Sequence, residues 1–503
     1  MLDVLVGAAG TGKSTTMAAV RQVWEGHYGP GSVIGLAPSA AAAEVLSQVA
    51  GIPSENTAKW LTENARNALR FEQIGELQAR LRRASPSLGT RAATGKLRAL
   101  IGEYRRWSLR PGQLIIVDEA SMAGTFDLDT LTTQAWQAGA KVLLVGDWGQ
   151  LSPVTAGGAF SLLVNDRDDA PELLDVRRFA HQWERQASLG LRNGLVGIVD
   201  AYDTHGRITG GGREAMLGAL YGGWRADIAA GRRSLMIAAD NETVRDLNAR
   251  ARADRVATGA VQDCGVELSD GTPAGVGDLV VTRHNDRTLA TGSGWVKNGD
   301  TWTVVDIDRR GALTVARSGR GGNTTLPPEY VRHHVELGYA TTAHRAQGQT
   351  VDTAHAFISP ATQREPLYVM ATRGREANML YVDTARDFDP EAAHVAGDDV
   401  DVLDVLRRVV ADSGMAKSAT QEIADQWAHA HAASTQSAQY ATIAAAIERG
   451  GSLAQQDPDM RRALDDRADL IRQAAAARLS NRAAVRGSAP FDPPSPVVTG
   501  PEI

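Results

Sequence analysis

The sequence predicts an α/β protein with two domains built on parallel sheets, and three observations support this fold class. Short apolar runs begin at Leu2, Gln113 and Lys141, and each passes directly into a glycine-rich or polar turn, as is typical of buried parallel strands. Strands and helix-forming segments alternate up to about residue 175, and another strand-then-helix unit begins at Ser234. With 503 residues and 43% hydrophobic content, the chain can bury two or three cores.

The first strand leads into a loop, GAAGTGKST, that matches the phosphate-binding pattern G-x-x-x-x-G-K-[ST] at every fixed position. A helix-forming segment follows, so strand, loop and helix agree. Backbone N–H groups of such a loop point at phosphate oxygens, while Lys13 reaches the β and γ phosphates and Ser14 offers a hydroxyl to Mg²⁺. The residues predicted to bind a nucleotide here are Gly7, Ala8, Ala9, Gly10, Thr11, Gly12, Lys13, Ser14 and Thr15.

Two carboxylates, Asp118 and Glu119, follow the apolar strand that begins at Gln113. A buried parallel strand delivers its last residues to the edge of the sheet where ligands bind. We predict that Asp118 coordinates the metal ion and that Glu119 orients or deprotonates the attacking water. An isolated Asp-Glu pair is more often a pair of solvated charges, but this pair ends a hydrophobic strand in a chain that has a phosphate loop.

The strand that begins at Lys141 runs into a polar turn that contains Gly146, Asp147 and Gln150. A glutamine at that position can sense the γ phosphate. Two further segments, GYATTAHRAQGQTVD from Gly338 and LYVMATRGREANMLYV from Leu367, complete the set of motifs.

Together these segments resemble the motifs of the superfamily 1 helicases. The chain is most similar to the RecD-like branch, which includes the helicase half of MobF-type conjugative relaxases (the TraA, TraI and TrwC kind). The resemblance covers roughly residues 1–385, with the motifs in the expected order. It implies an ATP-dependent helicase or translocase that acts on single-stranded DNA with Mg²⁺, moves 5′ to 3′, and works with relaxosome or other conjugation proteins. A repair helicase of the RecD type is the nearest rival, and a non-translocating or decayed P-loop protein is the other.

The resemblance also implies a domain plan. Residues 1–175 are expected to form RecA-like domain 1A, with a mainly helical insertion, 1B, at about 60–110. Residues 176–264 and 334–388 are expected to form RecA-like domain 2A.

Three further segments complete this plan. Residues 265–333 contain short alternating runs split by Gly, Asp and Asn turns, which predict a small β module. The resemblance makes this module an SH3-like β-barrel insertion, 2B, that either contacts DNA or is purely structural. Residues 389–482 predict a helical tail, which is a partner-docking element or the remnant of a longer protein, and residues 483–503 predict disorder.

Arginine fingers are implied at Arg178 in motif IV and Arg373 in motif VI. Charge that develops on the transferred phosphoryl group must be neutralised by cations that arrive when two domains close. In a chain with 53 basic residues a single arginine can equally be a surface charge, but Arg373 has apolar strand-like runs on both sides. The predicted catalytic residues are Lys13, Asp118, Glu119, Gln150, Arg178 and Arg373.

In the family, motif V touches both DNA and the nucleotide. The resemblance therefore assigns Thr342, His344 and Gln347 to DNA binding and Gly348 to the nucleotide, and it adds Thr57 as a DNA contact. A metal-ligand role for His344 is disfavoured because no cysteine or second histidine lies at ligand spacing.

The segment from Arg80 to Arg110 carries nine basic residues and one acidic residue. This local excess matters more than the net charge of −6, because phosphate contacts combined with stacking aromatic rings suit single-strand binding. We predict DNA contacts by Arg105, Arg106 and Trp107. The alternative is a solvated helical face, since only six basic residues of the whole chain are lysines.

The sequence departs from the family pattern in motif III, where Ser152 replaces a proline, and after motif V, where Thr350 replaces a glutamate. It also begins at the first strand, without the Q motif that holds adenine and without a relaxase domain. We therefore expect weak ATP binding, poor discrimination of ATP from GTP, and no DNA nicking by this chain.

A cytoplasmic location is expected. One cysteine, Cys264, excludes a disulfide framework, and no apolar run approaches the ~18 residues of a membrane span. The N-terminus also lacks the basic start and cleavage site of a signal peptide.

Overall fold

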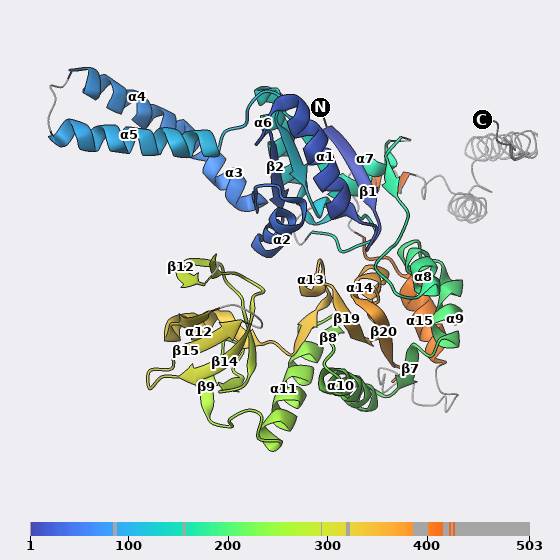
Figure 1. Ribbon diagram of the computed structural model, residues 1–503. Helices are drawn as coiled ribbons and strands as arrows, with labels where there is room; N and C mark the ends of the chain where they lie inside the picture. Colours follow the sequence, from blue (N-terminus) through green and yellow to red (C-terminus); the bar gives the residue numbers. More distant parts are fainter. Residues whose placement is uncertain are drawn as a thin grey trace, which may run out of the picture. The chain divides into compact units, whose positions relative to one another are not determined.

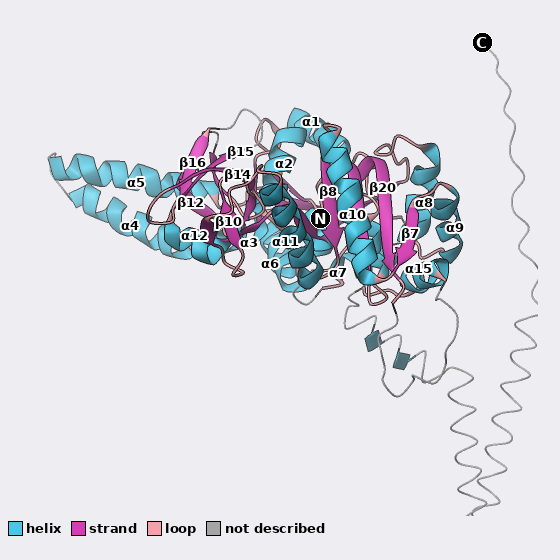
Figure 2. Cartoon of the chain, turned by 90° about the horizontal axis from the view of Figure 1, so that it is seen from below, coloured by secondary structure: helices cyan, strands magenta, loops and turns pink. Residues whose placement is uncertain are grey.

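The computed structural model describes residues 2–83, 88–153, 157–167, 169–292, 294–317, 322–385 and 401–415, with the short pieces 422–423 and 426–427. Residues 1–418 form one compact unit, which carries the features analysed below, and residues 419–503 form another. The predicted helical tail lies largely outside the described residues, and the predicted disordered segment lies wholly outside them. The predicted α/β class with parallel sheets is confirmed (Figures 1 and 2). Among the described helices, none is long and apolar enough to cross a membrane.

The first lobe is built on a parallel sheet of six strands in the order β3-β2-β4-β5-β1-β6. Its strands are β1 (Leu2–Gly7), β2 (Val33–Ala37), β3 (Ser54–Asn56), β4 (Leu114–Val117), β5 (Lys141–Gly146) and β6 (Glu172–Leu173). The covering helices are α1 (Lys13–Tyr28), α2 (Ala40–Ala50), α3 (Thr57–Ala65), α6 (Thr125–Ala138) and α7 (Ala159–Asn165), with a 3₁₀ turn, η1 (Ala120–Met122).

Alternate residues of these strands enter two separate cores, which is why the strands are apolar without interruption. On β4, Ile115 and Val117 pack in the core that includes residues of α3 and α6, whereas Leu114 and Ile116 pack with α1 and α2. Helices therefore cover both faces of the sheet. The carboxyl ends of β1, β4 and β5 lie at one edge, where each passes into a predicted motif.

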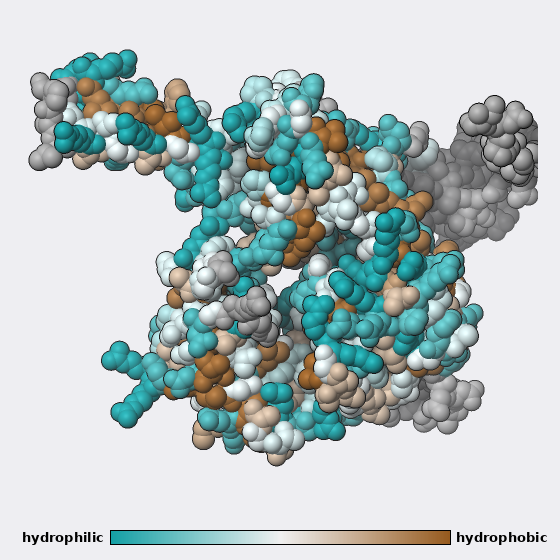
Figure 3. Space-filling model, viewed as in Figure 1, coloured by the Kyte–Doolittle hydropathy of each residue, from teal (hydrophilic) through white to brown (hydrophobic). Residues whose placement is uncertain are grey.

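A helical arm leaves the first lobe between β3 and β4, within the interval predicted to hold the 1B insertion. Its helices, α4 (Asn67–Arg83) and α5 (Leu88–Arg106), run side by side away from the sheet in Figures 1 and 2. Figure 3 shows hydrophilic residues along the outer edges of the arm and a hydrophobic strip where the two helices meet. Leu77 of α4 and Leu97 of α5 are partly buried.

The second lobe has a parallel sheet in the order β18-β8-β19-β20-β7. Its strands are β7 (Ile208–Gly211), β8 (Ser234–Ala238), β18 (Ala340–Thr342), β19 (Val351–Ile358) and β20 (Gly374–Asp383). Its helices are α8 (Gln182–Arg192), η2 (Val196–Ile198), α9 (Val199–Thr204), α10 (Arg213–Ala229), α11 (Asn241–Ala257), α13 (Ala343–Ala346), α14 (Arg364–Met370) and α15 (Val402–Ala411). On β8, Met236 packs in one core with α10 and α11, and Ile237 packs in another with α14 and α15.

The α15 helix belongs to the core of this lobe, although the sequence analysis placed it in a separate tail. Its stripe of Val405, Leu406, Val409 and Val410 is buried with residues of α14 and β20. Burial of such a stripe removes apolar area that would otherwise face water. The boundary predicted at residue 388 is therefore wrong for this helix.

An antiparallel module is inserted between α11 and β18. Its five-stranded sheet has the order β16-β15-β14-β11-β17, and β9 with β10 and β12 with β13 form two hairpins. The bounds are β9 (Gly265–Glu267), β10 (Pro273–Gly275), β11 (Leu279–Thr282), β12 (Asp286–Thr291), β13 (Gly294–Val296), β14 (Thr301–Ile307), β15 (Leu313–Arg317), β16 (Asn323–Leu326), α12 (Pro328–His334) and β17 (Val335–Leu337). Its SH3-like character stays a prediction.

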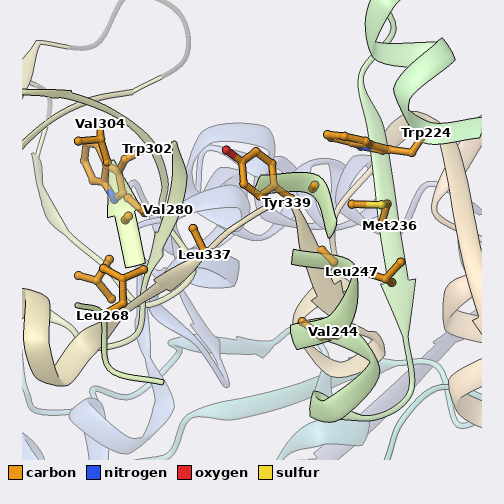
Figure 4. Packing of buried hydrophobic residues seen from close by; sticks show 14 of the residues in the cluster. Trp224, Met236, Val244, Leu247, Leu268, Val280, Trp302, Val304, Leu337 and Tyr339 are labelled. Atoms are coloured by element: carbon orange, nitrogen blue, oxygen red, sulfur yellow. The ribbon is translucent and has the colours of Figure 1, made fainter. Parts of the chain in front are cut away.

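The inserted module shares a core with the second lobe. Figure 4 shows Tyr339 between the module's Trp302 and Leu337 on one side and the lobe's Trp224 and Met236 on the other. Because one continuous cluster crosses the boundary, the module is anchored to the second lobe by packing as well as by the chain.

Candidate functional site

The phosphate loop joins β1 to α1 and depends on glycine geometry. Gly10 and Gly12 have φ values of +84° and +83°, a region that L residues with side chains rarely adopt. A Cβ atom on Gly10 would also collide with the Cβ atom of Arg178, in the segment that connects β6 to α8. Glycine here therefore permits both the shape of the loop and the close approach of that arginine. In this arrangement Lys13 Nζ donates to the carbonyl of Gly7 at 2.7 Å.

Asp118 and Glu119 lie at the carboxyl end of β4. Glu119 has a φ of +50° and is the single non-glycine residue with a positive φ in the described part of the chain. Such strain in a residue with a side chain is a common feature of functional sites, and here it turns Glu119 away from the strand direction of Asp118. Burial and the charge of Glu119 raise the pKa of Asp118 to about 7, while the charge of Lys13 acts in the opposite direction.

Arg178, from the segment that connects β6 to α8, and Arg373, which immediately precedes β20 of the second lobe, approach this edge. Arg373 is buried, and its guanidinium donates to the carbonyl of Val369 and to the hydroxyl of Thr372, both at 2.8 Å. Arg178 donates to the carbonyl of Thr372 at 2.7 Å. Burial and the neighbouring Arg178 lower the pKa of Arg373 to about 9, which keeps it charged near neutral pH. No salt bridge to either arginine is found among the described residues, although the charge of Glu119 acts to raise the pKa of both. Arg373 is buried and Arg178 is partly buried, so two largely desolvated cations face the loop.

These groups meet in one cleft of about 800 Å³ between the lobes. Lys13, Asp118 and Glu119 line it from the first lobe, Arg373 lines it from the second, and Arg178 lines it from the segment that connects the two. The other predicted residues on its wall are Ala8, Ala9, Gly10, Thr11, Gly12, Ser14, Gln150, His344, Gln347 and Gly348. Segments separated by more than 300 positions in the sequence thus form one site with a phosphate cradle, two acids and two arginines.

The chain resembles known proteins along most of its length. A model of an AAA domain matches residues 1–213. The conjugal transfer protein TraA of Rhizobium radiobacter is 31% identical over 389 residues, which make up 76% of this chain and 31% of that protein. The ATP-dependent RecD2 DNA helicase of Deinococcus radiodurans is 29% identical over 386 residues, 75% of this chain and 46% of that protein. The chain is a relative of the RecD-like superfamily 1 helicases.

This relationship to RecD-like helicases confirms the predicted resemblance, including the link to TraA. The chain spans about a third of the TraA protein and about half of RecD2. Among solved structures, the Pif1 helicase from Candida albicans aligns with a TM-score of 0.45 and 17% identity, over 77% of this chain and 92% of that one.

The RecD-like motifs are linked across the cleft by side chains. Gln347 of motif V donates through Nε2 to Glu119 Oε2 of motif II at 3.1 Å. Gln150 of motif III donates through Nε2 to Asp147 at 3.0 Å, and its own Oε1 is buried without a partner. Motifs from both lobes therefore share hydrogen bonds in this arrangement.

Two residues that the sequence analysis did not select, Tyr368 and Arg192, complete this contact. The Tyr368 hydroxyl and the Arg192 guanidinium both donate to Asp147, at 2.9 and 2.7 Å. In the sequence Tyr368 stands in the apolar run LYVM and has the pattern of a core residue. The only sequence feature that could have pointed to a role for Tyr368 is its position five residues before Arg373. Arg375, which also lines the cleft, was likewise overlooked.

The predicted DNA contacts are only partly placed where DNA could reach them. Arg105 and Arg106 are exposed in the last turn of α5. Trp107 is 4% exposed, packs edge-on against Trp60 at 5.6 Å between ring centroids, and donates through Nε1 to Glu103. The prediction that Trp107 stacks on bases is therefore wrong, because its rings serve the core of the first lobe.

Motif V and α3 give a similarly mixed outcome. Thr57 is buried and its hydroxyl donates to the carbonyl of Ala37 at 3.1 Å, which contradicts a direct DNA contact. Thr342 is also buried, at the N-cap of α13, whereas His344 is exposed on the cleft wall. Gly7 and Thr15, which were also predicted to bind the nucleotide, lie at the two ends of the loop, next to the loop residues that line the cleft.

The cleft offers donors that fit Mg²⁺. A serine hydroxyl from Ser14 and a carboxylate from Asp118 both reach its wall, and hard oxygen ligands of this kind suit that ion. Because Mg²⁺ is usually held by one or two protein oxygens together with substrate phosphates, this donor set fits a magnesium ion that binds with a nucleotide.

Proposed function

We propose that this chain is a Mg²⁺-dependent ATPase that uses hydrolysis to move 5′ to 3′ along single-stranded DNA, in the service of conjugative DNA transfer. The observation that carries the proposal is the cleft between the lobes. There Lys13 and the two acids face Arg178 and Arg373, so one bound triphosphate would contact both lobes at once. The 5′-to-3′ polarity rests on the resemblance to RecD-like helicases.

Hydrolysis would use the groups as follows. Lys13 and the loop amides hold the β and γ phosphates, and Glu119 accepts a proton from the attacking water. The cations of buried Arg373 and partly buried Arg178 neutralise charge that develops on the phosphoryl group, which costs little reorganisation because hydrogen bonds already hold both side chains in place. Ser14 and Asp118 would hold Mg²⁺, which would supply further neutralisation of phosphate charge when bound.

Coupling to DNA would run through motif V. Gln347, in the segment that also carries exposed His344, donates to Glu119. A strand that displaces this segment would therefore change the orientation of the proposed base. The bond supplies a direct physical link between the DNA-contacting segment and the reaction.

The same cleft also carries positive charge suited to a polyanion. Arg283 of the inserted module and Arg345 of motif V line the cleft and share one carboxylate, that of Glu336, at 3.3 and 3.1 Å. Burial and the neighbouring Arg345 lower the pKa of Arg283. Two guanidiniums with one counterion favour an additional anion, and a DNA phosphate supplies it.

The cellular role has two candidates. The TraA relative favours conjugative transfer, with relaxosome proteins as partners, and the RecD2 relative favours repair. Replacement of Lys13 by Ala in the cell should abolish plasmid transfer and leave survival after DNA damage unchanged. The opposite pattern would assign the chain to repair.

Movement along DNA is tested by displacement of streptavidin from biotinylated oligonucleotides. With ATP, the protein should displace streptavidin from the 3′ end much faster than from the 5′ end, because a 5′-to-3′ motor pushes toward the 3′ end. Glu119→Gln, which should bind nucleotide without hydrolysing it, serves as the control and should displace neither. Equal displacement from both ends, or none from either, would contradict a directional translocase.

A further inference from the structure

Tyr368 places one hydroxyl between three segments of the fold. The hydroxyl accepts a hydrogen bond from the backbone N–H of Ala9 in the phosphate loop at 2.8 Å, and it donates to Asp147 Oδ2 in motif III at 2.9 Å. Tyr368 belongs to α14 of the second lobe, whereas Ala9 and Asp147 belong to the first. The side chain is fully buried, so water does not compete for either bond.

Asp147 accepts several hydrogen bonds beside the Tyr368 hydroxyl. It is completely buried and accepts hydrogen bonds from Tyr368, from Gln150 Nε2 at 3.0 Å and from Arg192 Nε at 2.7 Å. Although burial acts to raise the pKa of Asp147, the charge of Arg192 and these donors hold it below its ordinary value. A buried carboxylate is tolerated only when it is paired and hydrogen-bonded in this way.

The geometry points to Tyr368 as a positioning residue that makes the phosphate loop and Gln150 depend on where the second lobe sits. Ala9 belongs to the loop, Gly7 to Thr15, that is expected to bind the nucleotide, and it lines the cleft. The bond from Gln150 Nε2 to Asp147 fixes the orientation of the Gln150 amide, whose Oε1 is buried without a partner, and Gln150 is one of the residues that line the cleft. If the second lobe withdraws, Tyr368 withdraws with it, and both the loop and the glutamine lose their support. This inference rests on the proposed ATPase.

A second site in the same chain repeats this chemistry away from the cleft. The Tyr339 hydroxyl accepts from the backbone N–H of Leu279 at 3.2 Å and donates to Asp278 at 2.6 Å. Asp278 is buried and also accepts from Arg252 Nε at 3.0 Å. Tyr339 lies between the second lobe and the inserted module (Figure 4). Tyr339→Phe therefore removes the same two kinds of hydrogen bond as Tyr368→Phe, but outside the nucleotide cleft.

The kinetic test compares these two variants with the unmodified protein at saturating single-stranded DNA. Tyr368→Phe should lower kcat for ATP about tenfold, while the Kd for nucleotide changes less than about threefold, because the lost bonds orient groups that act mainly in the transition state. Tyr339→Phe should leave kcat within about twofold, although both variants should lower Tm by a similar few degrees. Equal values of kcat in the two variants, or an unchanged kcat in Tyr368→Phe, would overturn the inference.

Hydrogen exchange tests the role of Tyr368 without requiring ATP hydrolysis. In the nucleotide-free protein the Ala9 amide should be protected, and a peptide covering residues 7–15 should exchange faster in Tyr368→Phe than in Tyr339→Phe or the unmodified protein. An unprotected Ala9 amide in the unmodified protein would overturn the inference even if Tyr368→Phe failed to fold. If the unmodified protein hydrolysed no ATP, the proposed function would fail, and the exchange rates would still decide the role of Tyr368.

Discussion

At the scale of single residues, Arg373 is the clearest test of the phosphoryl-transfer chemistry. Its donors are fixed by the acceptors on Val369 and Thr372. Arg373→Ala should therefore cut ATP turnover by roughly 10²-fold or more, and Arg373→Lys should recover only part, because an ammonium cannot reproduce the planar fork. Exposed Arg332→Ala is the control, and its turnover should not change. Turnover above about half of normal in Arg373→Ala would exclude a role as an arginine finger. The sequence could single out Arg373 because a motif surrounds it, whereas Tyr368 has the pattern of an ordinary core residue and its partners lie 221 and 359 positions away.

At the scale of elements, the helical arm formed by α4 and α5 is predicted to contact single-stranded DNA. If Arg105 and Arg106 contact phosphates, replacing both with Ala should flatten the salt dependence of single-strand binding by about one unit of slope per lost contact. ATP turnover without DNA should stay the same. The control replaces Arg309 and Arg310, which are exposed in the turn between β14 and β15. An unchanged slope in the arm variant would favour a solvated helical face. The positive charge of the arm could be predicted from the sequence. The burial of Trp107 could not, because it depends on packing against Trp60 from α3.

At the scale of the whole molecule, the two parallel sheets could be predicted because each strand carries its own pattern and each motif ends a strand. The docking of α15 could not, although its apolar stripe is visible in the sequence. The surface that receives α15 is assembled from α14, β20 and α9, so only the folded lobe defines it. The cleft could be predicted only in part. The family resemblance predicted which residues belong to it, but not the hydrogen bonds that cross it, such as that from Gln347 to Glu119, because these depend on how the lobes are placed.

Coupling of nucleotide hydrolysis to DNA in one cleft can be measured as the rate of ATP hydrolysis with and without single-stranded DNA. We expect turnover that requires Mg²⁺ and rises strongly with DNA. Lys13→Ala should reduce it by roughly 10²-fold, because the charge that holds the γ phosphate is lost, and Lys141→Ala, in the exposed ion pair with Asp3, should not. Turnover in the unmodified protein that is the same with and without DNA would contradict the account.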